Sequence, residues 1–261
     1  MSTELLALEA ESPRPAVLAG KVILVTGASR GLGRAIAQSC AQHQATVLLL
    51  GRDLKRLEAL ADEIEGAAQP SPLIVPFNLE GASVDDYATI AELIAQRCGR
   101  LDGVVLNAAL LGEISNFETY DPVLWARVFQ VNVHSQFMLL RVCLPLLRKA
   151  ATASVVFTAS GVGRRGRAYW GAYAASKFAL EGMMQTLADE LRGVSQIRVN
   201  SLNPGRLRTR MRALAYPAED PTTLPAPESV APYFVHLLSD AHARHGQTLE
   251  LPTSPAEPLN H

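Results

Sequence analysis

The 261-residue sequence lacks the features that would assign it to a membrane, to secretion or to a polyanionic partner. It has no stretch of about 20 uncharged apolar residues, the length that spans a bilayer. Lys and Arg number 24 against 25 for Asp and Glu, and this net charge of −1 gives no general attraction for nucleic acid or an anionic membrane. Residues 1–18 have acids among their leucines and no basic start or long apolar core, so we expect no secretory signal and a cytoplasmic protein.

Cysteine is scarce as well. Cys40, Cys98 and Cys143 are odd in number and far apart, which fits neither a disulfide framework nor a metal-ligand spacing. We therefore expect small buried thiols in a reducing compartment, and no metal site.

The chain does contain a regular alternation of apolar runs and helical patterns. Apolar runs without polar alternation, such as residues 21–26, are typical of strands buried on both faces of a parallel sheet. We predict strands at 21–26, 46–50, 73–77, 103–106, 154–158, 197–202 and 248–251, and helices at 31–42, from Asp53 onward, at 83–98, 121–150 (with Pro145 kinking its last turns), 170–192 and 228–239.

This alternation predicts an α/β fold of one domain, a doubly wound seven-stranded parallel sheet with helices on both faces. Residues 1–20 are expected to form an N-terminal arm, residues 21–251 the domain and residues 252–261 a C-terminal tail. The proline-rich residues 203–227 are expected to be irregular.

A glycine-rich turn, T-G-A-S-R-G-L-G from Thr26 to Gly33, lies between the first strand and the first helix. Glycines there permit a tight turn and let backbone N–H groups approach a pyrophosphate at the positive end of the helix. We expect this turn to bind a dinucleotide through Gly27, Ser29, Arg30, Gly31, Leu32 and Gly33.

The same turn also reads as G-x-S-x-G, the nucleophile elbow of α/β-hydrolases, with Ser29 as nucleophile. Against this remote alternative, the turn follows the first strand of the chain and leaves no room for the strands that carry an oxyanion loop. His236, His242 and His245 are available as bases but occupy no special context.

The second strand ends in L-L-L-G-R-D, at Gly51, Arg52 and Asp53. An acid at this strand tip binds the ribose hydroxyls of NAD, whereas a nearby arginine accommodates the extra phosphate of NADP. Arg52, with Arg30 as a second cation, favours NADP(H) over NAD(H). The alternative is that Arg52 is an ordinary solvated side chain.

Three reactive groups lie between Ser160 and Lys177. Tyr173 and Lys177 are four residues apart, on one face of a predicted helix, and Ser160 follows the strand before it. An ammonium beside a phenol favours the phenolate, so we expect Lys177 to move the pKa of Tyr173 toward neutrality. Taken alone, Y-A-A-S-K could also be an ordinary helix face.

The motifs in combination resemble those of the short-chain dehydrogenase/reductase family. T-G-x-x-x-G-x-G, N-A-A at Asn107–Ala109, and Ser160 followed by Y-x-x-x-K occur in the family's order over about residues 20–250. Residues 162–184 and Y-P-A-E-D-P at 216–221 are most similar to the YciK-like oxidoreductases. The resemblance implies a Rossmann fold.

The resemblance also implies roles for individual residues. Tyr173 would be the general acid, Ser160 would polarise the carbonyl oxygen, and Lys177 would bind the nicotinamide ribose and lower the pKa of the phenol. Asn132 would hold a water that links Lys177 to solvent. Further cofactor contacts would come from Asn78, Leu79, Asn107, Ala108, Pro204, Gly205 and Thr209, and the substrate pocket from Ser160, Trp170 and Tyr173.

Three positions depart from the family's pattern. Asn78 replaces the usual aspartate, Ala109 stands where glycine is usual, and the last strand lacks a glycine pair, which puts the C-terminal contacts in doubt. Two basic segments lie near the predicted site: Arg164, Arg165 and Arg167 beside the catalytic strand, and Arg206, Arg208, Arg210 and Arg212 in the irregular stretch. For most of these arginines we expect a solvated face, and the alternative is that they bind an anionic substrate or the cofactor phosphates.

The resemblance implies a small-molecule carbonyl or alcohol substrate, acted on by NADP(H)-dependent hydride transfer in a homodimer or homotetramer. No nucleic acid or membrane partner is expected. An alternative function is an NADP(H)-binding sensor or scaffold that keeps the fold, although the full set of Ser160, Tyr173, Lys177 and Asn132 argues against it. The sequence does not identify the substrate.

Overall fold

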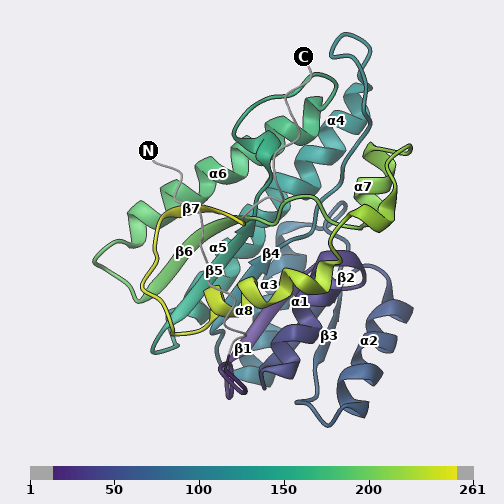
Figure 1. Ribbon diagram of the computed structural model, residues 1–261. Coiled ribbons are helices and arrows are strands. Elements are labelled where there is room, and N and C mark those ends of the chain that lie inside the picture. The colour runs from purple at the N-terminus through teal and green to yellow at the C-terminus, as the bar shows by residue number, and fades with distance from the viewer. Residues whose placement is uncertain (1–13, 252–261) are drawn as a thin grey trace.

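The centre of the structure, a computed structural model that describes residues 14–251, is one parallel sheet of seven strands (Figure 1). The strands are β1 (Val22–Thr26), β2 (Thr46–Gly51), β3 (Leu73–Pro76), β4 (Gly103–Leu106), β5 (Ala153–Thr158), β6 (Ile197–Asn203) and β7 (Gln247–Glu250). They are arranged in the order β3-β2-β1-β4-β5-β6-β7. The predicted doubly wound sheet is confirmed.

The strand order reverses direction between β1 and β4. The chain steps outward from β1 to β2 and β3, then returns to add β4 on the other side of β1, so that Ile23 pairs with Val47 of β2 and with Gly103 of β4. In open parallel sheets, ligands bind outside the carboxyl ends of the strands at such a reversal. This topology therefore predicts where the site lies.

Helices cover both faces of the sheet (Figure 1). They are α1 (Gly31–Gln42), α2 (Leu54–Gly66), α3 (Val84–Cys98), α4 (Pro122–Phe129), α5 (Ser135–Leu147), α6 (Gly171–Leu191), α7 (Arg210–Ala215) and α8 (Ala231–Leu238). Alternate residues of β1 enter two different cores: Ile23 packs with α1, α2 and α8, whereas Leu24 packs with α3, α5 and α6. Because both faces are buried, the strands are apolar without alternation.

Two segments differ from the predicted elements. The helix predicted at 121–150 is interrupted by one π-helical turn, Gln130–His134, and ends at Leu147. The stretch expected to be irregular contains α7, in whose first turn the N–H of Arg212 donates to the Thr209 side chain at 3.2 Å. No residue of α7 is buried, so it has no amphipathic pattern that a sequence reading could detect.

The chain packs against the sheet domain before residue 21. Residues 14–20 form turns, Leu18 is fully buried, and its N–H donates to the carbonyl of His43 at 3.0 Å. The remainder of the predicted arm, residues 1–13, and the predicted tail, residues 252–261, lie outside the described residues.

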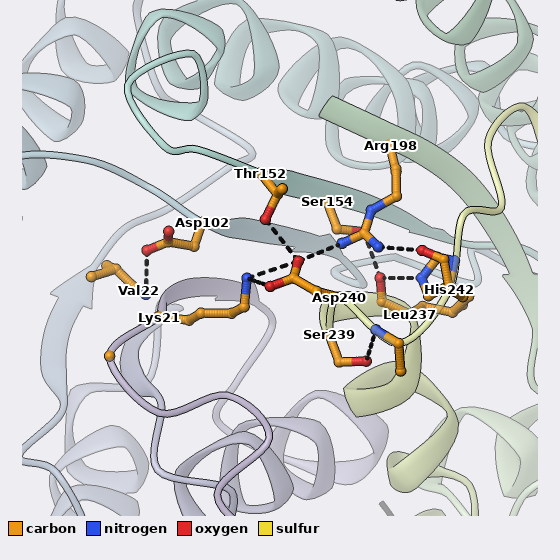
Figure 2. Close-up of polar contacts among 12 residues, drawn as sticks. Lys21, Val22, Asp102, Thr152, Ser154, Arg198, Leu237, Ser239, Asp240 and His242 are labelled. Carbon is orange, nitrogen blue, oxygen red and sulfur yellow. Dashed lines mark hydrogen bonds and ion pairs between the residues drawn. The ribbon is translucent and has the colours of Figure 1, made fainter. Parts of the chain in front are cut away.

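At the amino ends of the strands, Asp240 joins elements far apart in the sequence (Figure 2). It follows α8 and accepts hydrogen bonds from Lys21 Nζ at 3.1 Å, Thr152 Oγ1 at 2.7 Å and Arg198 Nη2 at 3.3 Å. These donors precede β1, precede β5 and belong to β6, so one carboxylate ties α8 across the base of the sheet.

His242, beside this network, is held in its neutral form. Its Nε2 lies 2.9 Å from the carbonyl of Leu237 and therefore carries the proton, and its Nδ1 accepts the N–H of Arg244 at 3.0 Å. A second proton on Nδ1 would displace that donor. Burial, together with the charges of Arg198, His236 and Arg244, lowers the pKa of His242 to about 4.

We expect this histidine to make the fold acid-sensitive. Because the folded-state pKa of about 4 lies below the ordinary value of 6.5 for a histidine, the unfolded chain binds the proton first. The free energy of unfolding should therefore fall by about 2 kcal/mol as the pH drops from 6.5 to 4, after allowance for partial exposure. Urea unfolding midpoints at several pH values should show a shallower dependence for His242→Gln, whose amide can donate and accept without titrating. His134→Gln is the control, and identical profiles for wild type and His242→Gln would refute the assignment.

Candidate active site

A cleft of about 1540 Å³ opens at the carboxyl ends of the strands. It is lined by residues that directly follow the strands, among them Gly27, Asn78, Asn107 and Ser160. Pockets for single small ligands measure roughly 300–1,000 Å³. The cleft is therefore large enough for a dinucleotide together with a second molecule.

The glycine-rich turn forms the start of the cleft. Gly27 and Gly31 have φ values of +69° and +55°, the left-handed region that favours glycine. A Cβ on Gly33 would lie 2.3 Å from the carbonyl oxygen of Gly27, so only glycine lets α1 begin this close to the turn. This geometry leaves the N-terminus of α1 directed at the cleft, as an anion-binding turn requires.

Thr26, which the sequence analysis did not single out as a site residue, joins this turn to β4. Its buried hydroxyl donates to the carbonyl of Val105 at 3.2 Å and accepts the N–H groups of Asn107 and Ala108, both at 2.9 Å. The Asn107 side chain in turn donates to the carbonyl of Thr26 at 3.1 Å. A polar side chain at the end of an otherwise apolar strand is the signal that could have identified it.

The three reactive groups meet at the centre of the cleft. Ser160 follows the end of β5, and its side chain lies close enough to the phenol of Tyr173, on the first turn of α6, to lower the pKa of that phenol. Lys177 lies one turn later, with Nζ 5.6 Å from the centre of the Tyr173 ring, and donates to the carbonyl of Thr158 at 2.7 Å. Gly163 packs directly on Lys177, because a Cβ there would lie 2.8 Å from the Cβ of the lysine.

Burial controls the protonation of this pair. It raises the pKa of Tyr173 to about 12, opposed by the hydrogen bond from Ser160, and it lowers the pKa of Lys177 to about 8, opposed by Glu181. The prediction that Lys177 shifts the phenol pKa toward neutrality is therefore not met in this structure. Lys177 is directed at Thr158, and the cost of burying the phenolate is larger. At neutral pH the phenol keeps its proton.

Asn132 lies in the π-helical turn and is fully buried. Its Oδ1 accepts the N–H of Leu110 at 2.7 Å, and its Nδ2 donates to the carbonyl of Leu110 at 2.9 Å and to Ser176 Oγ at 2.9 Å. The side chain thus fixes the segment after β4 against α6. Its predicted role in holding a water stays a prediction.

The structure brings the other predicted site residues together. All of the predicted cofactor and pocket residues line the cleft except Gly33, which acts through packing: Gly27, Ser29, Arg30, Gly31, Leu32, Arg52, Asn78, Leu79, Asn107, Ala108, Ser160, Trp170, Tyr173, Lys177, Pro204, Gly205 and Thr209. Among the catalytic candidates, Asn132 does not line it.

Four guanidinium groups gather near the end of β2. Burial and repulsion from Arg210, Arg52 and Arg56 lower the pKa of Arg30, so these three charges lie within electrostatic range of Arg30. Arg56 belongs to α2, where Asp53 accepts its N–H, and Arg210 begins α7. Arg210 belongs to the basic stretch that the sequence offered as a possible phosphate contact, whereas Arg56 was missed because the reasoning followed only the strand tip and the turn. Such a cluster suits an anion with several oxygens.

The basic segment near Ser160 divides into two parts. Arg164 forms ion pairs with Glu250 and Glu181 and donates to the carbonyl of Leu249 at 3.1 Å, so it is structural and not part of a solvated face. Its Glu250 partner lies in the last strand, where the family's glycine pair is missing. Arg165 and Arg167 line the cleft.

The geometry offers no support for a serine hydrolase. Within residues 14–251, no histidine lines the cleft that contains Ser29, and His236 and His242 stack on each other near α8 instead. The same residues include no cluster of three His, Cys, Asp or Glu side chains suited to a metal ion. Among their helices, none has the length and apolar character to cross a bilayer.

Comparison with known proteins agrees with this geometry. The family model for short chain dehydrogenases matches residues 21–220. The uncharacterized oxidoreductase YciK of Escherichia coli K12 is 46% identical over 232 residues, which cover 89% of this chain and 91% of that protein.

Solved structures agree as well. A short chain dehydrogenase from Pseudomonas syringae has a TM-score of 0.89 at 46% identity, with 96% of this chain and 98% of that chain covered. A second, from Escherichia coli CFT073 in complex with NADPH, has a TM-score of 0.89 at 46% identity, with 91% and 99% covered. The fold, the cleft and these matches together show that the chain belongs to the short-chain dehydrogenase family of oxidoreductases.

Proposed function

We propose that this protein is an NADP(H)-dependent oxidoreductase that interconverts the carbonyl and alcohol forms of a small molecule, with Tyr173 as the general acid and base. The observation that carries the proposal is the placement of the Ser160 side chain against the phenol of a buried Tyr173, with Lys177 against the same ring, in a dinucleotide-sized cleft. Bound NADPH would supply the hydride.

Ser160, Tyr173 and Lys177 would each have a separate role in the reaction. Ser160 and Tyr173 present two hydroxyls to the same place, where a carbonyl oxygen could accept both hydrogen bonds. The phenol holds its proton at neutral pH, so Tyr173 can donate it as negative charge develops on that oxygen. Lys177, with a pKa of about 8, is largely charged at neutral pH and stabilises the phenolate that remains.

NADP(H) is proposed as the preferred cofactor because of the four arginines near the end of β2. Arg210, Arg52 and Arg56 all repel the guanidinium of Arg30, and the 2′-phosphate of NADP would relieve that repulsion. Arg52 and Arg56 also have acidic neighbours, Glu80 at 3.9 Å and Asp53 at 3.1 Å. The ribose hydroxyls of NAD carry no charge and would leave the repulsion uncompensated. The complex of NADPH with the Escherichia coli CFT073 relative supports this choice.

Substitution of the catalytic tyrosine tests the reaction class. Tyr173→Phe should lower kcat for reduction of ketones and aldehydes by about 10²–10⁴-fold, the usual contribution of a general acid, and leave the Kd for NADPH largely unchanged. Oxidation of NADPH is followed by absorbance and its binding by fluorescence. Undiminished turnover would overturn the assignment. If the wild type binds NADPH tightly but reduces no carbonyl in a broad panel, the sensor alternative gains support instead.

The pH dependence tests the partnership of Lys177 and Tyr173. The rate of reduction should be constant near neutrality and fall as the pH rises through about 8, because Lys177 loses its proton there while the phenol keeps its own until about 12. Lys177→Arg keeps its charge across this range, so the decline near pH 8 should disappear from its kcat/KM profile. A decline of unchanged position in that variant would contradict the assignment.

Cofactor preference is tested at Arg52. Arg52→Gln should weaken NADPH binding by about 10- to 100-fold, the loss expected for a charge-assisted hydrogen bond, with much less effect on NADH. Titration of both cofactors by protein fluorescence gives the two Kd values. Arg192→Gln, an exposed position at the end of α6, is the matched control. Equal losses for NADPH and NADH would contradict a phosphate-specific role.

A further inference from the structure

The cleft is strongly basic, although the chain as a whole is nearly neutral. The chain carries a net charge of −1, but among the described residues that line the cleft, ten are Lys or Arg and only one, Glu80, is acidic. A cleft lined by one sign of charge concentrates ligands of the opposite sign. The bound cofactor accounts for part of this excess, and the remaining cations need a different explanation.

The cations separate into groups with different partners. Arg30, Arg52, Arg56 and Arg210 form the cluster near β2, and Lys177 belongs to the catalytic pair. Arg127 is bonded to Glu80 at 2.7 Å. The other cleft arginines lie on the segment before α6 and on the segment around α7: Arg165, Arg167, Arg206 and Arg212.

Tyr216 organises the second group. The Arg212 guanidinium stacks 3.7 Å from the centre of its ring and is neutralised by a two-point bond to Glu219, with both contacts at 2.5 Å. Arg167 Nη1 donates to the Tyr216 hydroxyl at 2.9 Å. A phenol oxygen orients a guanidinium without neutralising it. No carboxylate among residues 14–251 forms a salt bridge with Arg167, so its charge is positioned but uncompensated.

Aromatic rings connect this cation to the reacting groups. The Trp170 ring lies 5.7 Å from the ring of Tyr173 and 5.9 Å from the ring of Tyr216, measured between centroids. All three side chains line the same cleft as Arg167. A ligand whose carbonyl reaches Tyr173 can thus pass over an aromatic wall and end at a guanidinium.

We propose that the substrate carries an oxyanion, as a carboxylate or a phosphate ester, which Arg167 binds beside Tyr216 while the carbonyl group lies at Tyr173 and the intervening part packs on Trp170. This inference deepens the proposed function and rests on it. It names a substrate class, acidic carbonyl compounds, and assigns Arg167 as the residue that selects them. Guanidinium suits this role because its fork matches the oxygens of both groups.

The test uses ketones paired as an anion and a neutral analogue with the same carbonyl group. 4-Acetylbenzoate is compared with methyl 4-acetylbenzoate, 4-acetylphenyl phosphate with 4-methoxyacetophenone, and 6-oxoheptanoate with its methyl ester, all with saturating NADPH. The wild type should prefer the anionic member of at least one pair by about tenfold or more in kcat/KM, as expected for one charge-assisted hydrogen bond. The carboxylate and phosphate pairs identify which oxyanion is preferred.

Variants of Arg167 connect that preference to this side chain. Arg167→Gln should raise KM for the anionic ketone by about tenfold or more and affect the neutral partner much less, and Arg167→Lys should recover part of the loss. Arg192→Gln, outside the cleft, is the control. A wild type that reduces neutral ketones as well as anionic ones, or an Arg167→Gln variant that loses both equally, would overturn the anion site and leave the proposed function intact.

A binding measurement separates failure of the site from failure of the reaction. The NADP-loaded protein is titrated with 4-isopropylbenzoate and with 4-isopropylbenzamide, which have no reducible ketone, and isothermal titration calorimetry reports occupancy. Preference for the acid that is lost in Arg167→Gln would support the anion site even if no ketone were reduced. Equal binding of acid and amide would overturn it.

Discussion

The pairing of β1 with β2 on one side and β4 on the other is the constraint on which the rest of the structure depends. Because all seven strands are parallel, their carboxyl ends share one edge, and the reversal at β1 and β4 opens a crevice there. Thr26 holds the ends of β1 and β4 together, because its hydroxyl forms hydrogen bonds with Val105, Asn107 and Ala108. The cleft exists because these strand ends are held together.

Burial determines what the reactive groups can do. A phenol and an ammonium placed in the interior both shift toward their neutral forms, and this opposes the simple expectation that the lysine acidifies the tyrosine. The consequence is a Tyr173 phenol that keeps its proton at neutral pH. The charge on Lys177 is kept by the Thr158 carbonyl and by Glu181, which belongs to the same buried face of α6.

Arginine has three separate uses in this molecule. Arg164 joins α6 to β7 by ion pairs with Glu181 and Glu250. Arg30 lies near Arg52 at the end of β2. Arg167 is oriented by Tyr216 over the substrate end of the cleft. The first use is internal, whereas the other two place positive charge in the cleft of a chain that is nearly neutral overall. Net charge therefore says nothing about the ligand, because the distribution of charge decides what the cleft attracts.

The sequence by itself determined the sheet, the order of its elements, the glycine turn and the set Ser160, Tyr173 and Lys177, because these depend on local periodicity and on spacings within single elements. Only the tertiary structure decided the π-helical turn at Asn132 and the helix α7. It also decided the contacts of Arg56, Arg164 and Arg210, and the direction in which the pKa of Tyr173 shifts. These depend on which side chains meet across the fold and on how deeply they are buried. Neither the contacts across the fold nor the depth of burial can be deduced from the residue pattern of a single segment.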